Sequence, residues 1–211
     1  DWNNDATVSG TGDSVGAFRL GAGSRDSALV ATLEPGGYTA VVTGVGGNGV
    51  ALIEVYDAAS NQPITSQQLV NISTRGYVET GEGSLIAGFV VTGNAPKRVL
   101  IRGIGPSLSQ FQVDGVLADP TLKLYARGSD AVVAQNDDWS APQSVNATQI
   151  AASGAEISAA STATGAFPLA GGSKDAAIVI TLMPGQYSAV LSGANNTTGA
   201  GLVEVYEISN Y

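Results

Sequence analysis

Apolar and polar side chains alternate with a period of two along several short segments of the chain. Within 38–43 the even-numbered residues share one face and the odd-numbered residues lie opposite, and 187–192 repeats this alternation. Leu122 and Leu124 are likewise separated by the polar residue Lys123. A period of two is typical of a half-buried β-strand, because successive side chains of a strand point to opposite faces.

Short turn-forming sequences separate the alternating segments. They read "EPGG" at 34–37, "GNAP" at 93–96, "RGSD" at 127–130 and "MPGQ" at 183–186. Gly, Pro, Asn and Asp each favour a tight reversal of the backbone. Short strands at a spacing of roughly 8–12 residues are typical of sandwiches. The pattern predicts an all-β protein made of antiparallel β-sandwich or jelly-roll-like modules.

One stretch of the chain occurs twice. Residues 16–44 match residues 165–193 without a gap, at a constant spacing of 149 residues. After one extra residue in the second copy, "ALIEVYD" at 51–57 aligns with "GLVEVYE" at 201–207. Both copies start at an Asp-Trp pair, which is residues 1–2 in the first copy and 138–139 in the second. We call the copies A1 and A2.

A different unit, B, lies between the two copies and covers residues 69–137, so that the order is A–B–A. We predict an N-terminal β half-module over 1–60, which is A1. A complete β-sandwich module is expected over 61–211, made of B and of A2 at 138–207. The expected strands of A1 are "GAFRL", "ALVATL", "YTAVVTG" and "VALIEVYD". Such strands would form one sheet with an apolar face that needs a cover.

The connector between the Asp-Trp pair and the long repeat is 12 residues longer in A2 than in A1. The additional residues fall within 143–164, which is rich in Ala and Ser. We expect a surface insertion there with one short helix.

Composition excludes several classes of function. The chain has 211 residues, a formal net charge of −9 and no histidine or cysteine. An acidic balance argues against nucleic acid as a partner, since phosphates require a basic surface. Without histidine, Ser-His-Asp and Cys-His catalysis cannot operate, and the usual zinc and haem sites are missing. No apolar run approaches the roughly 20 residues that span a bilayer.

Two turns are rich in oxygen ligands. "QNDDW" contributes Asn136, Asp137 and Asp138, and "DWNND" contributes Asp1, Asn3 and Asp5. Calcium prefers six to eight oxygen ligands, so these residues are candidate calcium ligands and calcium is the one cofactor that the sequence suggests. The alternative interpretation is an Asx turn that ends a strand, with a tryptophan packed beneath it.

Paired carboxylates suggest no enzyme. Glu54 and Glu204 recur in the two "VEVY" segments, and duplicated glutamates in duplicated strands arise in any tandem β-repeat. A glycosidase needs two carboxyl groups roughly 5–9 Å apart in a cleft, and nothing in the sequence indicates one. We therefore predict a protein without enzymatic activity.

Aromatic residues recur at matched positions of the two copies and are expected to serve the core or the assembly of modules. They are Trp2 and Trp139, Phe18 and Phe167, Tyr38 and Tyr187, and Tyr56 and Tyr206. Exposed aromatic rings also stack on sugars, so that a carbohydrate platform is the alternative.

The segments "LVNISTRGYVETGEGSLIAGFVVTGNAPKRVLIRGIGPSL", "LADPTLKLY", "QNDDW", "GSKDAAIVITLMPGQYSAV" and "GLVEVYE" resemble a tandem β-repeat of very large bacterial cell-surface and extracellular proteins. The A half is also similar in style to bacterial pre-peptidase C-terminal domains. The resemblance implies an extracellular location and a stalk-like or adhesive role rather than an activity. In that family the repeat runs from "LVNIST" to "VEVYE", which makes residues 1–57 a truncated copy.

Together these features predict an extracellular structural protein that assembles head to tail into a filament, a fimbria-like fibre or a surface layer. A half-module without its counterpart would pair with a neighbouring copy of the chain, which would give a homopolymer, or with a neighbouring tandem repeat. The alternative is an adhesin module that binds carbohydrate or another surface and belongs to a larger secreted protein. Neither interpretation includes nucleic acid or a membrane span.

Overall fold

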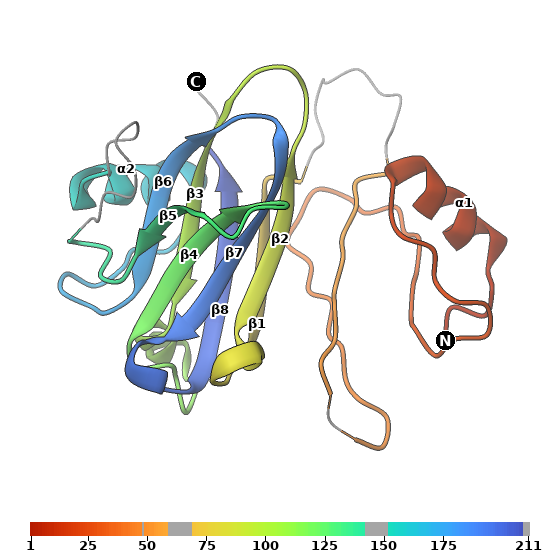
Figure 1. Ribbon diagram of the computed structural model, residues 1–211, viewed down its shortest axis with the longest axis horizontal. Helices are drawn as coiled ribbons and strands as arrows, with labels where there is room; N and C mark the ends of the chain where they lie inside the picture. Colours follow the sequence, from red (N-terminus) through yellow and green to blue (C-terminus); the bar gives the residue numbers. More distant parts are fainter. Residues whose placement is uncertain (48, 59–68, 142–151, 209–211) are drawn as a thin grey trace. The chain divides into compact units, whose positions relative to one another are not determined.

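The alternating segments form strands only in the later part of the chain (Figure 1). The computed structural model describes residues 1–47, 49–58, 69–141 and 152–208. In chain order the elements are α1 (Ala6–Val15), β1 (Asn71–Val78), η1 (Gly81–Gly83), β2 (Leu85–Val91), β3 (Lys97–Ile104), η2 (Pro106–Phe111), β4 (Pro120–Ala126), β5 (Val132–Asn136), α2 (Gly154–Thr164), β6 (Ala176–Leu182), β7 (Gly185–Gly193), η3 (Ala194–Asn196) and β8 (Gly199–Glu207).

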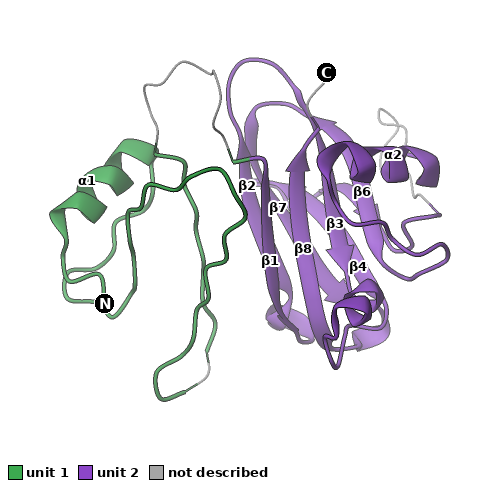
Figure 2. Ribbon diagram, turned by 180° about the vertical axis from the view of Figure 1, so that it is seen from behind, with its two compact units in different colours: residues 1–69 green, residues 70–211 purple. Residues whose placement is uncertain are grey.

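The chain divides into two compact units, Asp1–Leu69 and Val70–Tyr211, called unit 1 and unit 2 (Figure 2). Unit 2 is a sandwich of two antiparallel four-stranded sheets, with strand orders β1-β8-β3-β6 and β2-β7-β4-β5. The predicted all-β antiparallel sandwich is therefore confirmed. The predicted alternation also holds within it, because Leu122, Leu124, Ala189 and Leu191 are all buried.

The two halves of the sandwich are interleaved strand by strand. Of the six ladders between the described strands, five join a B strand to an A2 strand, and the sixth joins β4 to β5 within B. Within the described part of unit 2, no A2 strand pairs with another A2 strand. The expectation that an A unit forms one sheet beneath a cover is therefore wrong. Consecutive strands such as β6 and β7 enter different sheets, so that A2 contributes to both.

Two apolar clusters hold unit 2 together. One lies between the sheets and includes Val78, Ile101, Leu122, Leu191 and Val203. The other lies on the outer face of the first sheet, where α2 covers β3 and β6 (Figure 1); Leu100, Trp139, Ile157, Val179 and Tyr206 are among its members. The second cluster gives one sheet a buried outer face, which is unusual for a simple sandwich and which explains the near-continuous burial of β3 and β6.

Helix α2 confirms the short helix that the sequence predicts in the A2 connector. It begins at a capping box, in which the Ser153 hydroxyl accepts from the Glu156 N–H and the Glu156 carboxylate accepts from the Ser153 N–H. Unit 1 has a counterpart in α1, whose N-cap Asp5 accepts from the N–H groups of Thr7 and Val8. The helix therefore belongs to both copies and not to the insertion. Much of the additional sequence, 142–151, lies outside the described residues.

Unit 1 contains α1 and no strand among its described residues. Strands are thus missing at all four segments where the sequence predicts them in A1. "GAFRL" is a loop in A2 as well, since Gly16 and Gly165 each end the preceding helix with a positive φ. For the other three segments the reason is pairing: their A2 counterparts are β6, β7 and β8, which are held only by B strands.

None of the helices that the structure describes combines the length and the apolar character needed to cross a membrane.

Candidate half-module interface

Arg102 lies at the centre of the junction between B and A2. It stands on β3 directly opposite Glu204 of β8, and its side chain is fully buried. Its Nε and Nη2 donate to Glu204 Oε2 over 2.8 and 2.5 Å. On β3 the side chains of Val99 and Ile101 enter the core between the sheets, so Leu100 and Arg102 face the opposite way, beneath the A2 connector. The strand thereby places one cation inside an apolar cluster.

A2 satisfies the remaining groups of this ion pair. Arg102 Nη1 donates to the Phe167 carbonyl over 2.5 Å, and the Phe167 ring lies 4.2 Å from the guanidinium carbon. The Tyr206 hydroxyl donates to Glu204 Oε1 over 2.9 Å. A buried ion pair is stable only when the lone pairs and protons left over are also bonded. Phe167 and Tyr206 of A2 meet that condition for the pair of Arg102 and Glu204.

Asp175 of A2 forms the second buried contact with B. Its Oδ1 accepts from the N–H groups of Gly105 and Ser107 over 2.9 and 3.2 Å, and its Oδ2 accepts from the Ser107 hydroxyl. The Ser173 hydroxyl also donates to Oδ2 over 2.7 Å. The carboxylate is fully buried. Four donors thus stabilise its charge, and three of them come from the "RGIGPS" segment at 102–107.

The environment of Glu204 also changes the acidity of its neighbour. Burial raises the pKa of the Tyr206 hydroxyl far above its ordinary value of 10.0, and the charge and hydrogen bond of Glu204 raise it further. A group whose pKa is raised by folding contributes stability below its unfolded pKa, and this stability is lost as the pH rises through the folded pKa.

We therefore expect unit 2 to lose stability as the pH rises above about 10, where tyrosine ionises in the unfolded chain. Tyr206→Phe removes the titrating hydroxyl, so the slope of stability against pH should become shallower in that range. Urea unfolding at several alkaline pH values measures the slope. Tyr77→Phe, which changes an exposed tyrosine, should leave the slope unchanged. Equal slopes in wild type and Tyr206→Phe would contradict the expectation.

Unit 1 repeats the A2 residues of this junction but not their contacts with B. Asp26 corresponds to Asp175, and its Oδ2 accepts from Ser24 of its own loop over 2.6 Å. Glu54 corresponds to Glu204, and its Oε1 accepts from Tyr56 over 3.1 Å. The local half of each A2 arrangement is therefore present in unit 1. The half that B supplies in unit 2 has no counterpart among the described residues of unit 1.

The matched aromatic residues also fall into two groups: those that bond within their own copy and those that contact B in unit 2. Trp2 and Trp139 are both buried, and each indole N–H donates to a carbonyl and a serine hydroxyl of its own copy. Phe18, Tyr38 and Tyr56, which the sequence assigns to core or assembly, are 60%, 59% and 42% exposed. Their partners in unit 2 lie against B instead: Phe167 on Arg102, Tyr187 stacked on Phe89, and Tyr206 buried.

Three of the six candidate calcium ligands, Asn136, Asp138 and Asp5, bond within the protein, whereas Asp137 Oδ1 is buried without a hydrogen bond among the described residues. Asn136 accepts from the Ala177 N–H over 2.9 Å and donates to the Asp138 carbonyl, which matches the alternative interpretation as a strand-ending turn. Asp5 caps α1, while Asp1 and Asn3 are exposed. Asp138 pairs with Lys174 over 3.1 Å.

Burial, followed by the charges of Asp119 and Asp138, raises the pKa of Asp137. In the described part of the chain, no group of three or more acidic, histidine or cysteine side chains is arranged to hold a metal ion. Calcium therefore stays a prediction.

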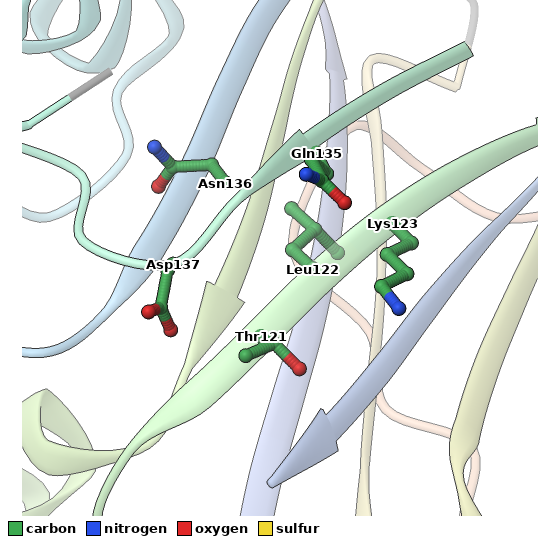
Figure 3. A pocket seen from close by; sticks show the side chains of 6 residues that line it. All are labelled: Thr121, Leu122, Lys123, Gln135, Asn136 and Asp137. Carbon is green, nitrogen blue, oxygen red and sulfur yellow. The ribbon is translucent and has the colours of Figure 1, made fainter. Parts of the chain in front are cut away.

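A small hollow lies beside the same turn (Figure 3). It encloses about 130 Å³, and it is lined by Thr121, Leu122, Lys123, Gln135, Asn136 and Asp137. Pockets for drug-sized ligands usually measure ~300–1,000 Å³. The hollow is therefore too small for a molecule of that size.

Sequence reasoning missed the central residues of the junction. Arg102 lies in "RGIGPS", which by itself indicates only a turn, and Asp175 lies in a loop between a helix and a strand. One signal was available in the aligned ranges, 16–44 with 165–193 and 51–57 with 201–207. Apart from the last aligned pair, Asp57 and Glu207, the acidic residues present in both copies are Asp26/Asp175 and Glu54/Glu204. Duplication of this kind arises in any tandem repeat, so it marks the two carboxylates but does not identify Arg102 as their partner.

Comparison with solved structures finds a distant likeness. No family model matches the chain, and no curated protein matches it. Among solved structures, the pre-peptidase C-terminal domain of collagenase from Bacillus anthracis is similar at a TM-score of 0.36 and 13% identity. The match covers 69% of this chain and 98% of that domain. A likeness at this level says nothing about function.

Proposed function

We propose that the chain is a non-enzymatic structural protein of β-sandwich modules, in which two half-modules complete each other by strand interleaving. The observation that carries the proposal is the pairing in unit 2, where five of the six described ladders join B to A2. Neither half has enough ladders of its own to form a sheet, so that folding and association are one event.

The buried junction makes this association selective. A2 contributes two buried carboxylates, Glu204 and Asp175, and B contributes the arginine and the N–H groups that match them. A wrong partner would leave these charges buried without a counterpart, which is strongly unfavourable. Selective and extensive pairing suits a load-carrying joint between modules better than a transient contact.

The proposed setting is the outside of the cell, as part of a surface fibre or layer. Low charge density, the lack of cysteine and the tandem order of halves are its supports. Heterologous contacts that do not close into a ring produce open polymers, and a half-module that pairs with a half-module of another polypeptide makes a contact of this kind. Carbohydrate binding, the alternative from the sequence, stays a prediction.

Fragment complementation tests the proposal. Residues 70–137 and residues 138–208 are prepared separately, and each is expected to lack the circular dichroism of a folded sandwich. Mixed in equal amounts, they should recover the sheets and a cooperative melting transition, because each supplies the ladders that the other lacks. The Arg102→Met fragment should assemble poorly, whereas Lys97→Met, at an exposed ion pair on the same strand, should assemble like wild type.

Two results would contradict the proposal. One is a cooperative transition of 70–137 by itself, which would mean that B needs no second half. The other is a mixture that stays unfolded under conditions in which the intact chain is folded.

A further inference from the structure

We propose that residues 1–57 are a docking half for a further B-type segment, other than the one that A2 occupies. By B-type segment we mean a polypeptide with the five strands of 70–137 and the "RGIGPS" motif at its centre. The inference rests on the proposed function and names the partner that it requires. It starts from the repeat, which gives unit 1 the same contact residues as A2.

The polar contact residues of unit 1 match the motif. In unit 2 the motif binds two carboxylates and one carbonyl of A2, at Glu204, Asp175 and Phe167. Their equivalents in unit 1 are Glu54, Asp26 and Phe18. Each has the same residue type at the same place in the repeat, so the motif would meet an identical set of acceptors. The two carboxylates favour a cationic partner, and the B motif contains an arginine.

The apolar contact residues of unit 1 are present but uncovered. Leu33 is 53% exposed, whereas Leu182 at the matching position of β6 is 2% exposed. Ile53 is 43% exposed, and the matching Val203 of β8 is fully buried. In unit 2 these positions are buried because B strands flank them on both sides or across the sandwich. Large apolar residues that are exposed in unit 1 and buried by B in unit 2 mark a surface that binds another chain segment.

A pair of compensating differences supports the same packing. Gly201 of β8 has no room for a side chain, since an added Cβ would lie 2.9 Å from the Leu191 Cδ2 atom. Unit 1 has Ala51 at the position of Gly201, and it has Val42 at the position of Leu191. Unit 1 thus has the larger residue at the first position, Ala51 for Gly201, and the smaller residue at the second, Val42 for Leu191. This is expected if both residues of unit 1 pack against each other between two sheets.

Unit 1 is also prepared locally for the partner. The Trp2 backbone N–H donates to the Asp26 carbonyl over 2.8 Å, and the Trp139 N–H donates to the Asp175 carbonyl over the same distance. The loop that carries the acidic contact residue therefore has its docked form before any B strand is present. Only the segments that need ladders lack their A2 structure.

The partner is neither the B unit of this sequence nor a second copy of it. Strands β1 to β4 already pair with A2 through five ladders, so A1 could replace those ladders only by displacing A2. The B unit of a second copy of residues 1–211 would likewise be paired with its own A2. The partner we infer is a B-type segment outside residues 1–211, in the same polypeptide or in another one, that is not already paired with an A unit.

The experiment extends the full chain by one B unit. A copy of 70–137 is joined directly before Asp1, just as 137 is followed directly by Asp138 in the natural sequence. Amide hydrogen exchange is then measured over 28–33, 38–43 and 50–56. In the 211-residue chain these amides should exchange almost as fast as in an unfolded peptide. In the extended chain we expect protection to rise at least about 100-fold, toward that of 176–207.

Matched variants show whether the same contacts are used. Asp26→Asn with Glu54→Gln should remove most of the gained protection in the extended chain. Arg102→Met made only in the added copy should have the same effect, and Lys97→Met in that copy should have none. Protection of 176–207 should not change in any of these variants.

Two outcomes would overturn the inference: protection over 28–56 that does not rise when the B copy is added, or protection that is already complete in the 211-residue chain. Fragment complementation separates this failure from a failure of the proposed function. If 70–137 and 138–208 combine but 28–56 stays unprotected, then only the role of residues 1–57 is refuted.

Discussion

Arg102→Met is expected to lower the free energy of unfolding of unit 2 by about 3–5 kcal/mol. The substitution leaves the Glu204 carboxylate buried with only the Tyr206 hydroxyl as a partner, and it also breaks the bond to the Phe167 carbonyl. An unpaired buried charge costs more than the ion pair contributes, since desolvation is no longer offset. Urea unfolding followed by far-ultraviolet circular dichroism measures the change.

A double-mutant cycle separates the charge from the packing. Arg102→Met with Glu204→Met removes both charges, so most of the lost stability should return, and a result at or above the wild-type value is consistent with the same physics. The control is Lys97→Met: Lys97 pairs with Glu207 across the same two strands, but the two side chains are 47% and 32% exposed. Solvent screens that pair, and its loss should cost less than about 1 kcal/mol.

Glu54→Gln provides a second control, because it changes the same residue type in the other copy of the repeat. Glu54 belongs to unit 1, where it accepts from Tyr56, so the stability of unit 2 should change by no more than about 0.5 kcal/mol. If Arg102→Met lowered the free energy of unfolding as little as Lys97→Met does, the importance of the buried ion pair between Arg102 and Glu204 would be refuted.

Gly201→Ala is expected to destabilise unit 2 by about 1–3 kcal/mol. The added methyl group would lie 2.9 Å from both Leu191 Cδ2 and Val78 Cγ2, in the core between the sheets. Those side chains are fully buried, and neither can move without disturbing its neighbours. Thermal and urea unfolding of the intact chain measure the loss.

The sequence of unit 1 suggests a rescue. Leu191→Val removes one of the two atoms nearest to the new methyl group and reproduces the Val42 and Ala51 combination of A1. By itself Leu191→Val should cost roughly 1 kcal/mol through the cavity that it creates. The double variant should be more stable than the sum of the two single effects allows, by about 1 kcal/mol. Strict additivity would show that the two positions do not share space.

Interleaving explains why unit 1 and unit 2 differ so much although their sequences repeat. In one sheet β3 separates β8 from β6, and in the other β7 lies between β2 and β4. The hydrogen bonds of the A2 strands therefore reach across long sequence distances, about a hundred residues for Arg102 and Glu204. An A segment without B cannot pair with itself in this arrangement. Repeated sequence therefore produces repeated structure only where the bonds are local.

Short-range pattern determined much of unit 2. Leu122 and Leu124 are buried as their period of two predicts, and the turns at 93–96, 127–130 and 183–186 each separate two strands. The repeat identified A2 and A1 as equivalents, and the Trp2 and Trp139 loops share their hydrogen bonds accordingly. These features depend on neighbours within about 35 residues, which the sequence order itself supplies.

The buried ion pair between Arg102 and Glu204 could not be predicted in this way. The sequence shows an arginine in a Gly-rich turn and a glutamate in a distant strand, and nothing in either segment specifies their register. Only the placement of β8 between β1 and β3 brings the two side chains to opposite positions.

The sequence by itself determined an all-β chain, its internal repeat, its strand faces and the positions of its turns, because alternation and turn chemistry act over a few residues. Only the tertiary structure decided that B and A2 share both sheets and that one buried arginine joins them. It also decided which copy of the repeat forms strands. Hydrogen-bond partners of a β-strand lie outside the strand, so the same residues are strands beside B and remain loops without it.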